Sequence, residues 1–104
     1  MQVIRWQKQE MPRESDLRKQ MQSQGLSPYT WSNGPHERYT VHSHSYQKVL
    51  YCVEGSIRFM LPDVEGDAGI LDLVAGDCMI LPAHVRHSAV VGSQGVTCLE
   101  AAQY

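Results

Sequence analysis

The residues of this sequence best suited to chemistry are three histidines and a lysine. His42 and His44 stand two positions apart, Lys48 follows them, and His87 lies much further along the chain. Because successive side chains of a strand point to opposite faces, two imidazoles at i and i+2 share one face and can bind one metal ion. With His87 as a third ligand, these residues predict a three-histidine metal site.

Short strands are expected to position these histidines. After Gly25 the sequence consists of brief apolar or aromatic stretches broken by Gly, Pro, Asn and Asp, a pattern typical of antiparallel strands. Strands are expected over residues 38–44, 48–53, 56–61, 69–74, 78–81, 87–91 and 96–100. Glu54-Gly55 and Ala75-Gly76-Asp77 have the chemistry of tight turns, and residues 62–69 have the length of an open hairpin loop. The pattern predicts an all-β barrel or sandwich.

One helix is expected before the strands, over residues 12–24. Pro12 suits a first helical turn, Leu17 and Met21 are spaced i,i+4, and Gly25 can supply a left-handed end. A chain of 104 residues has room for one core of this kind. We therefore expect one domain over residues 1–104, with a barrel core at about 30–100 and an N-terminal strand and helix within 1–25.

The spacing of the motif residues resembles that of the cupin superfamily, whose motifs are G-x5-H-x-H-x(3,4)-E-x6-G and G-x5-P-x-G-x2-H-x3-N. The matching residues are His42, His44 and Gly55 in the first motif, and Gly76, Pro82 and His87 in the second. The resemblance covers roughly residues 30–100 and implies a double-stranded β-helix, or jelly-roll barrel, whose motif histidines hold a divalent metal. It also implies a homodimer in which residues 3–7 exchange or pair between copies.

The sequence departs from both motifs. Position 36 is a histidine, with the nearest glycine at Gly34, and His84 and Val91 stand where glycine and asparagine are usual. The most consequential departure is Lys48, which takes the place of the motif glutamate and so removes the fourth ligand.

A charged Lys48 would repel a metal ion strongly. Two unit charges 4 Å apart interact by about 4 kcal/mol at an effective dielectric of about 20, and a divalent ion roughly doubles this energy. We expect the lysine to swing toward solvent; loss of its proton and weak metal binding are the other possibilities. The three imidazoles, with open positions, then suit divalent Fe, Zn, Ni, Cu or Mn.

Three further residues are candidates for the surroundings of the metal. His84, on a loop at the barrel mouth, could act as a base or substitute ligand, although a solvated loop histidine is the simpler interpretation. Cys52 shares strand parity with Lys48, but we prefer a packed core thiol. Tyr46 could cover the site or contact a partner copy.

Four other residues near the motifs are weaker candidates. The aromatic residues that precede the histidine pair, Tyr29, Trp31 and Tyr39, are expected in the core or an interface rather than in a ligand cage. Glu100, near the end of the last strand, reaches the site only if its side chain faces inward.

Composition narrows the classes of function. Nine basic and 11 acidic residues give a net charge of −2, which argues against nucleic acid as a partner. No apolar run approaches the roughly 20 residues of a membrane span, and the first residues lack the apolar stretch of a secretion signal. Three widely spaced cysteines favour a reducing compartment. We expect a cytoplasmic protein that binds a small molecule.

Two functions fit these observations. One is a metal-dependent enzyme, oxygen-using or hydrolytic, that acts on a small anionic molecule, with the Lys48 ammonium available to hold a substrate carboxylate. Cupins with three histidines and no acid include dioxygenases, so the resemblance implies this activity class. The other is a binding or sensor module without turnover, with or without metal. A structural barrel with inert, hydrogen-bonded histidines is a third interpretation.

Overall fold

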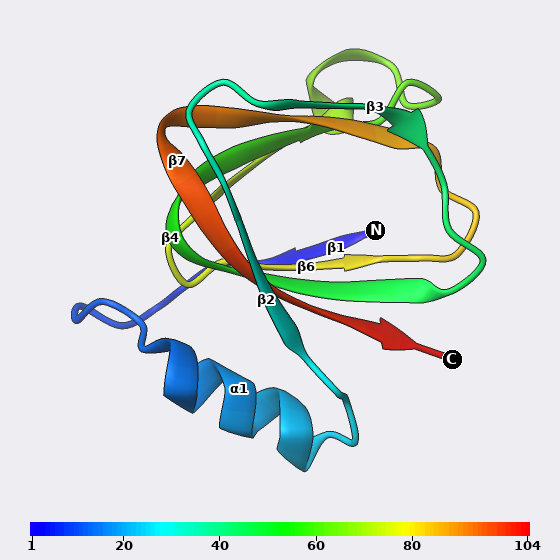
Figure 1. Cartoon of the computed structure of the whole chain (residues 1–104). Helices are drawn as coiled ribbons and strands as arrows, with labels where there is room; N and C mark the ends of the chain where they lie inside the picture. Colours follow the sequence, from blue (N-terminus) through cyan, green and yellow to red (C-terminus); the bar gives the residue numbers. More distant parts are fainter.

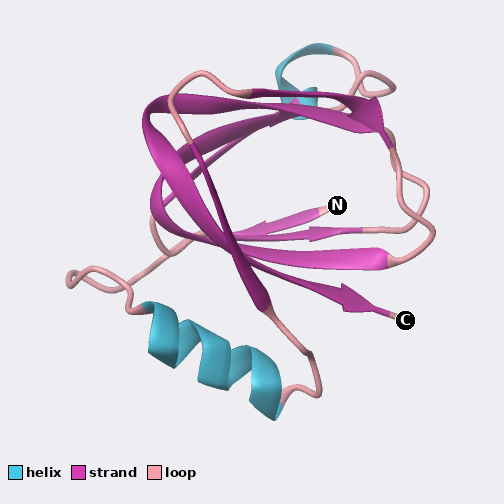
Figure 2. Ribbon diagram, viewed as in Figure 1, coloured by secondary structure: helices cyan, strands magenta, loops and turns pink.

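The computed structural model describes residues 1–104 and shows a β-barrel with one α-helix on its outside (Figures 1 and 2). The strands are β1 (Gln2–Ile4), β2 (Tyr29–Asn33), β3 (Arg38–His42), β4 (Gln47–Met60), β5 (Ile70–Val74), β6 (Cys78–Leu81) and β7 (His87–Gln103). The helix α1 spans Glu14–Ser23, and a short 3-10 helix η1 spans Gly66–Gly69. All strand pairs are antiparallel, in the order β1-β6-β4-β7-β2, with β3 on β7 and β5 on β4. The predicted all-β, jelly-roll architecture is confirmed.

Two long strands form the frame of the barrel, where the sequence predicted four short ones. In Figure 1 both β4 and β7 curve around the barrel, so each strand forms part of two opposite walls of the barrel. The predicted turn at Glu54-Gly55 is wrong: β4 continues through it, with register shifts at this point against β7. Gly55 has a φ of +80°, and a Cβ there would lie 2.0 Å from the carbonyl oxygen of Gly95. The glycine therefore permits a bulge and a close strand approach, rather than a hairpin turn.

The helix covers the outer face of the sheet. α1 falls within the predicted range, and Leu17 and Met21, on its inner face, are buried against strand residues that include Val49 and Leu99. Gly25 ends the helix with a φ of +82°, as predicted. No helix of the chain is long and apolar enough to span a membrane.

The helix explains why the first half of β4, residues 48–53, is covered on both faces. Leu50 and Cys52 point into the barrel and belong to its inner apolar cluster. Val49 and Val53, on the opposite face, belong to the cluster beneath α1. Consecutive apolar residues in this strand therefore all find a covered environment, which is typical of a strand packed on both sides.

The N-terminal strand pairs within its own chain. Gln2, Val3 and Ile4 lie opposite Ile80, Met79 and Cys78 of β6. β1 lies at the edge of the sheet, with β6 as its neighbour. The exchange or pairing of residues 3–7 between copies, which the resemblance implied, stays a prediction. Trp6 continues beyond β1 and lies over Gly76, where a Cβ would come within 2.3 Å of the indole Cγ.

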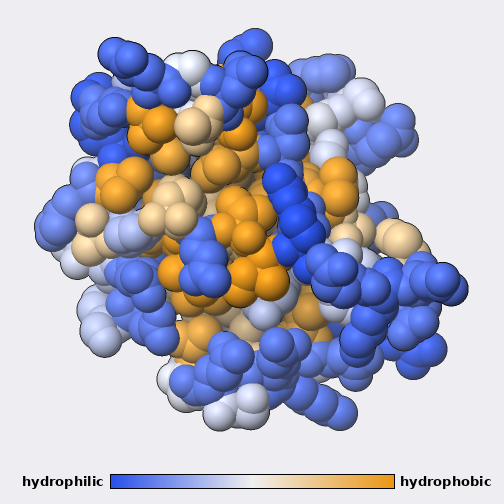
Figure 3. Space-filling model, turned by 180° about the vertical axis from the view of Figure 1, so that it is seen from behind, coloured by the Kyte–Doolittle hydropathy of each residue, from blue (hydrophilic) through white to orange (hydrophobic).

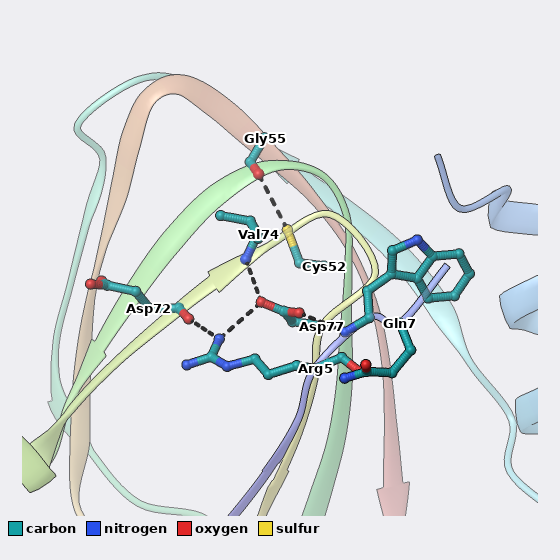
Figure 4. Close-up of polar contacts among 8 residues, drawn as sticks. Arg5, Gln7, Cys52, Gly55, Asp72, Val74 and Asp77 are labelled. Atoms are coloured by element: carbon teal, nitrogen blue, oxygen red, sulfur yellow. Dashed lines mark hydrogen bonds and ion pairs between the residues drawn. The ribbon is translucent and has the colours of Figure 1, made fainter. Parts of the chain in front are cut away.

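A buried carboxylate holds this N-terminal segment in place (Figure 4). Asp77, only 2% exposed, accepts hydrogen bonds from Arg5 Nη1 at 2.9 Å, from the Trp6 backbone N–H at 3.0 Å and from the Val74 backbone N–H at 3.0 Å. The three donors come from two segments far apart in the sequence. Asp77 therefore ties β1 to the turn between β5 and β6.

We expect Asp77→Ala to lower the free energy of unfolding by about 3 kcal/mol, because three hydrogen bonds to a buried carboxylate are lost and two part-buried backbone donors are left without a partner. Urea denaturation followed by circular dichroism measures the change. Asp63→Ala is the matched control: its 2.8 Å ion pair with Arg86 is 62% exposed on the Asp63 side and should contribute no more than about 1 kcal/mol. Equal losses in the two variants would contradict this role of Asp77.

Candidate metal centre

The fold brings the three predicted ligands together at one end of the barrel. His42 is the last residue of β3 and lies opposite His87, the first residue of β7, in the sheet register. His44 follows in the connection to β4. The ring centroids are 4.4 Å apart for His42 and His87, 4.9 Å for His42 and His44, and 5.2 Å for His44 and His87. One nitrogen of each ring lies within 4.8 Å of the other two.

The hydrogen bonds of the rings leave their other nitrogens free. His42 Nδ1 lies 2.7 Å from the Thr40 carbonyl oxygen, and His87 Nδ1 lies 2.9 Å from that of Val85. A carbonyl only accepts hydrogen bonds, so each Nδ1 carries the proton and each Nε2 of a neutral ring keeps its lone pair. Carbonyl groups commonly orient metal-binding histidines in this way.

Two of these nitrogens are buried without any partner. Nε2 of His44 and Nε2 of His87 have no hydrogen-bond partner in the structure. A buried polar atom without a partner costs roughly 1–3 kcal/mol, and a metal ion would satisfy both atoms at once. The donor set therefore fits a divalent metal.

The surroundings also favour neutral imidazoles. Burial lowers the pKa of His44, the positive charge of Lys48 and the neighbouring His42 ring lower it further, and the negative charge of Glu100 opposes them. Burial likewise lowers the pKa of His87. The hydrogen bond to Val85 opposes this effect, whereas Lys48 and the other two histidines add to it. Metal binding requires the neutral form, which these lowered pKa values favour.

Tyr46 lies directly against the site. Its ring stacks on His44 at a centroid distance of 4.9 Å and an interplanar angle of 28°. Tyr104 lies beyond it, with ring centroids 5.8 Å apart. Of the two roles predicted for Tyr46, the structure supports the first, because the ring covers one face of His44.

His84 acts through its backbone. Its side chain is exposed, and its N–H donates a 2.7 Å hydrogen bond to the His44 carbonyl oxygen. The residue has a φ of +68°, a conformation that favours glycine and so explains why glycine is usual at this motif position. The structure thus agrees with a solvated loop histidine.

Cys52 lies in the barrel core. It is fully buried in the inner apolar cluster, opposite Cys98 on β7. Its thiol lies 3.7 Å from the Glu54 carbonyl oxygen and 3.6 Å from that of Gly55. This is the packed core thiol that we expected.

A cavity of about 230 Å³ opens beside the histidines. Its polar lining consists of His42, His87, Lys48 and Glu100, and its aromatic lining of Tyr29, Trp31, Tyr39 and Phe59. The three aromatic residues that precede the histidine pair thus line a ligand-sized space, which was not expected of them. Trp31 also packs against the inner apolar cluster, as predicted.

Lys48 faces this cavity, so the expectation that it swings toward solvent is wrong. Its side chain is 8% exposed, and Nζ lies 3.5 Å from Glu100 Oε1. Glu100 is itself fixed by the Tyr29 hydroxyl, which donates to Oε2 at 2.7 Å, and by Trp31 Nε1, which donates to Oε1 at 3.1 Å. A buried lysine is tolerated here because a buried carboxylate lies beside it.

Sequence reasoning left the orientation of Glu100 open, although a signal for it exists. Glu100 is the one charged residue in the apolar stretch of residues 96–102, and Lys48 stands at the head of a similar stretch in residues 48–53. A charge within a buried strand requires a partner, so two such residues of opposite sign are candidates for an ion pair.

No model of a known protein family matches the sequence. Among solved structures, an RmlC-like cupin from Shewanella frigidimarina is similar, with a TM-score of 0.61 and 28% identity, over 74% of this chain and 64% of that one. The chain belongs to the cupin superfamily. A DMSP lyase from Ruegeria pomeroyi shares the cupin's fold at 16% identity and a TM-score of 0.65, over 76% of this chain and 38% of that one.

A similarity in sequence extends to one curated enzyme. The cupin is 33% identical over 66 residues to a 3-hydroxyanthranilate 3,4-dioxygenase of Burkholderia lata. The match covers 64% of this chain and 37% of the dioxygenase, so the cupin spans well under half of that relative's length.

Proposed function

We propose that this cupin is a metal-dependent enzyme that binds one divalent transition metal through His42, His44 and His87 and uses dioxygen to oxidise a small anionic molecule. The observation that carries the proposal is the pair of buried Nε2 atoms, on His44 and His87, that have no partner. The partial similarity to a dioxygenase supports the reaction class.

The residues of the chain have separate roles in this proposal. A redox-active ion at the site would supply the one-electron chemistry that lets dioxygen react with an organic molecule. The carbonyl oxygens of Thr40 and Val85 fix the orientation of two ligand rings, and the ring of Tyr46 shields the third. The cavity, with largely aromatic walls, limits the water that reaches the bound substrate.

The test is oxygen uptake by the metal-loaded protein. Protein loaded with Fe²⁺ without air, then given dioxygen and a panel of small aromatic acids that includes 3-hydroxyanthranilate, should consume oxygen only when protein and substrate are both present. The same protein loaded with Zn²⁺ is the matched control, because zinc has no redox chemistry and should give no uptake. Equal rates with the two metals, or no uptake with any acid, would contradict the proposed reaction.

The second candidate function is a small-molecule binding or sensor cupin without turnover. It is favoured by the Lys48–Glu100 pair, since the lysine stands where the motif carries a carboxylate ligand. Tight binding of an acid from the panel, without oxygen uptake, would select this function.

We further propose a cytoplasmic homodimer. The resemblance to small cupins supports the dimer, and three free, buried cysteines are typical of a protein in a reducing compartment. Figure 3 shows apolar side chains exposed on the rear face of the molecule. The exposed apolar residues of the edge strands include Ile4 of β1 and Ile70 and Val74 of β5, each more than two fifths exposed. A second copy would cover such residues.

A further inference from the structure

We propose that the cavity takes a small aromatic monocarboxylate, with Lys48 as the anchor for the carboxylate and Glu100 as the positioning residue that holds the lysine. The inference rests on the proposed function, because it names the substrate class of the same site. It is argued from the shape, the lining and the charges of the cavity.

The lining favours a flat ring. Trp31 and Tyr39 meet edge to face, with centroids 5.9 Å apart, and both border the cavity together with Phe59. Aromatic rings pack favourably against such walls in stacked or edge-to-face arrangements. The volume of about 230 Å³ is below the roughly 300–1,000 Å³ of pockets for drug-sized ligands, so a molecule with a single ring is the expected size.

The Lys48 ammonium retains the capacity to bind an anion. Its 3.5 Å separation from Glu100 Oε1 is longer than the roughly 2.7–2.9 Å of a charge-assisted hydrogen bond. An ammonium has three donors, and Glu100 already accepts hydrogen bonds from Tyr29 and Trp31. The glutamate thus keeps the lysine in the cavity without using all of its donors.

The charges favour a monoanion over a dianion or a neutral ligand. One ammonium beside one carboxylate gives the polar end of the cavity little net charge, so a dianion such as phosphate would be repelled by Glu100. A neutral ligand can accept a hydrogen bond from the Lys48 ammonium but lacks the attraction between opposite charges that a carboxylate adds. A carboxylate, with one charge and two acceptor oxygens, is the group that matches this end of the cavity.

Binding of benzoate to the metal-free protein tests the inference. In a Trp6→Phe background Trp31 is the remaining tryptophan, and ligand in the cavity should quench its fluorescence. Benzamide, which has the same shape without the charge, should bind at least about tenfold more weakly. Calorimetric titration of the unmodified protein gives the same comparison without relying on the Trp6 variant. Equal affinities for the two probes, or no binding of either, would overturn the inference.

Two variants should change benzoate affinity in opposite directions. Lys48→Met removes the anchor and should weaken benzoate binding about tenfold or more, while benzamide binding stays the same. Glu100→Gln keeps an acceptor for Tyr29 or Trp31 but removes the counter-charge, and should strengthen benzoate binding about threefold or more. A general structural effect would weaken the binding of both benzoate and benzamide in both variants. That result would overturn the roles assigned to Lys48 and Glu100. If Lys48→Met does not fold, two other results test the inference: the benzoate affinity of Glu100→Gln, and the comparison of benzoate with benzamide in the unmodified protein.

The outcome is separable from that of the proposed function. The titrations use metal-free protein. Failure to bind metal would therefore overturn the enzyme proposal, while the preference for benzoate over benzamide would still be measurable and would still support the substrate class. Conversely, metal binding without any preference for benzoate over benzamide would overturn only the substrate class.

Discussion

His44→Ala is expected to lower the affinity of this cupin for Zn²⁺ by about a hundredfold or more. Removal of a residue that only orients a metal ligand typically costs 10- to 100-fold in affinity, so loss of one of three ligands should cost at least the upper value. The fold should survive in the metal-free state, because the substitution also removes a buried Nε2 that has no partner. Competition with a zinc chelator at pH 7 measures the affinity.

The matched control is His84→Ala. His84 lies on the neighbouring loop and contacts the same segment, but through its backbone N–H and with an exposed side chain. Its zinc affinity should stay within about twofold of the unmodified protein, since the imidazole takes no part in the site. Equal affinities in His44→Ala and the unmodified protein would show that the metal, if bound, lies elsewhere.

Lys48→Glu should destabilise the metal-free protein strongly and raise its metal affinity. The new carboxylate, on a side chain one bond shorter, would still face Glu100, whose Oε1 lies 3.5 Å from Lys48 Nζ. Two like charges 4 Å apart repel by about 4 kcal/mol at an effective dielectric of about 20. A divalent ion would relieve this repulsion, and the substitution also removes a cation from its surroundings. Calorimetric melting with and without Zn²⁺ should show a lower melting temperature without metal and a larger increase on adding it.

The double variant Lys48→Glu/Glu100→Gln separates the two effects. It keeps the new carboxylate but removes the like-charge repulsion, so much of the metal-free stability should return while the gain in zinc affinity persists. A zinc affinity unchanged by Lys48→Glu would contradict the position of this residue beside the metal.

The histidine cluster and the barrel were predictable because their signals are local. The expected strand over residues 38–44 placed His42 and His44 on the same side of the chain, and the second motif supplies His87 at a fixed spacing from Pro82. The strand itself ends at His42, but the rings of His42 and His44 still lie together, with centroids 4.9 Å apart. The helix was predictable for the same reason, since the i,i+4 spacing of Leu17 and Met21 records the face that it buries.

The features that were mispredicted depend on contacts between distant segments. Gly55 supplies a positive φ that suits a tight turn and a bulge equally, and only the approach of Gly95 selects the bulge. The inward orientation of the Lys48 side chain depends on Glu100, which Tyr29 and Trp31 hold in place; these three residues lie on two other strands. A lysine is expected to face solvent unless a buried anion is known to lie beside it.

X-ray absorption at the zinc edge of the Zn²⁺-loaded protein tests the central claim most directly, that His42, His44 and His87 hold one metal ion. We expect one zinc per chain, with scattering from three imidazole rings and Zn–N distances of about 2.0–2.1 Å. Zinc that is not retained, or a spectrum without imidazole scattering, would contradict this claim.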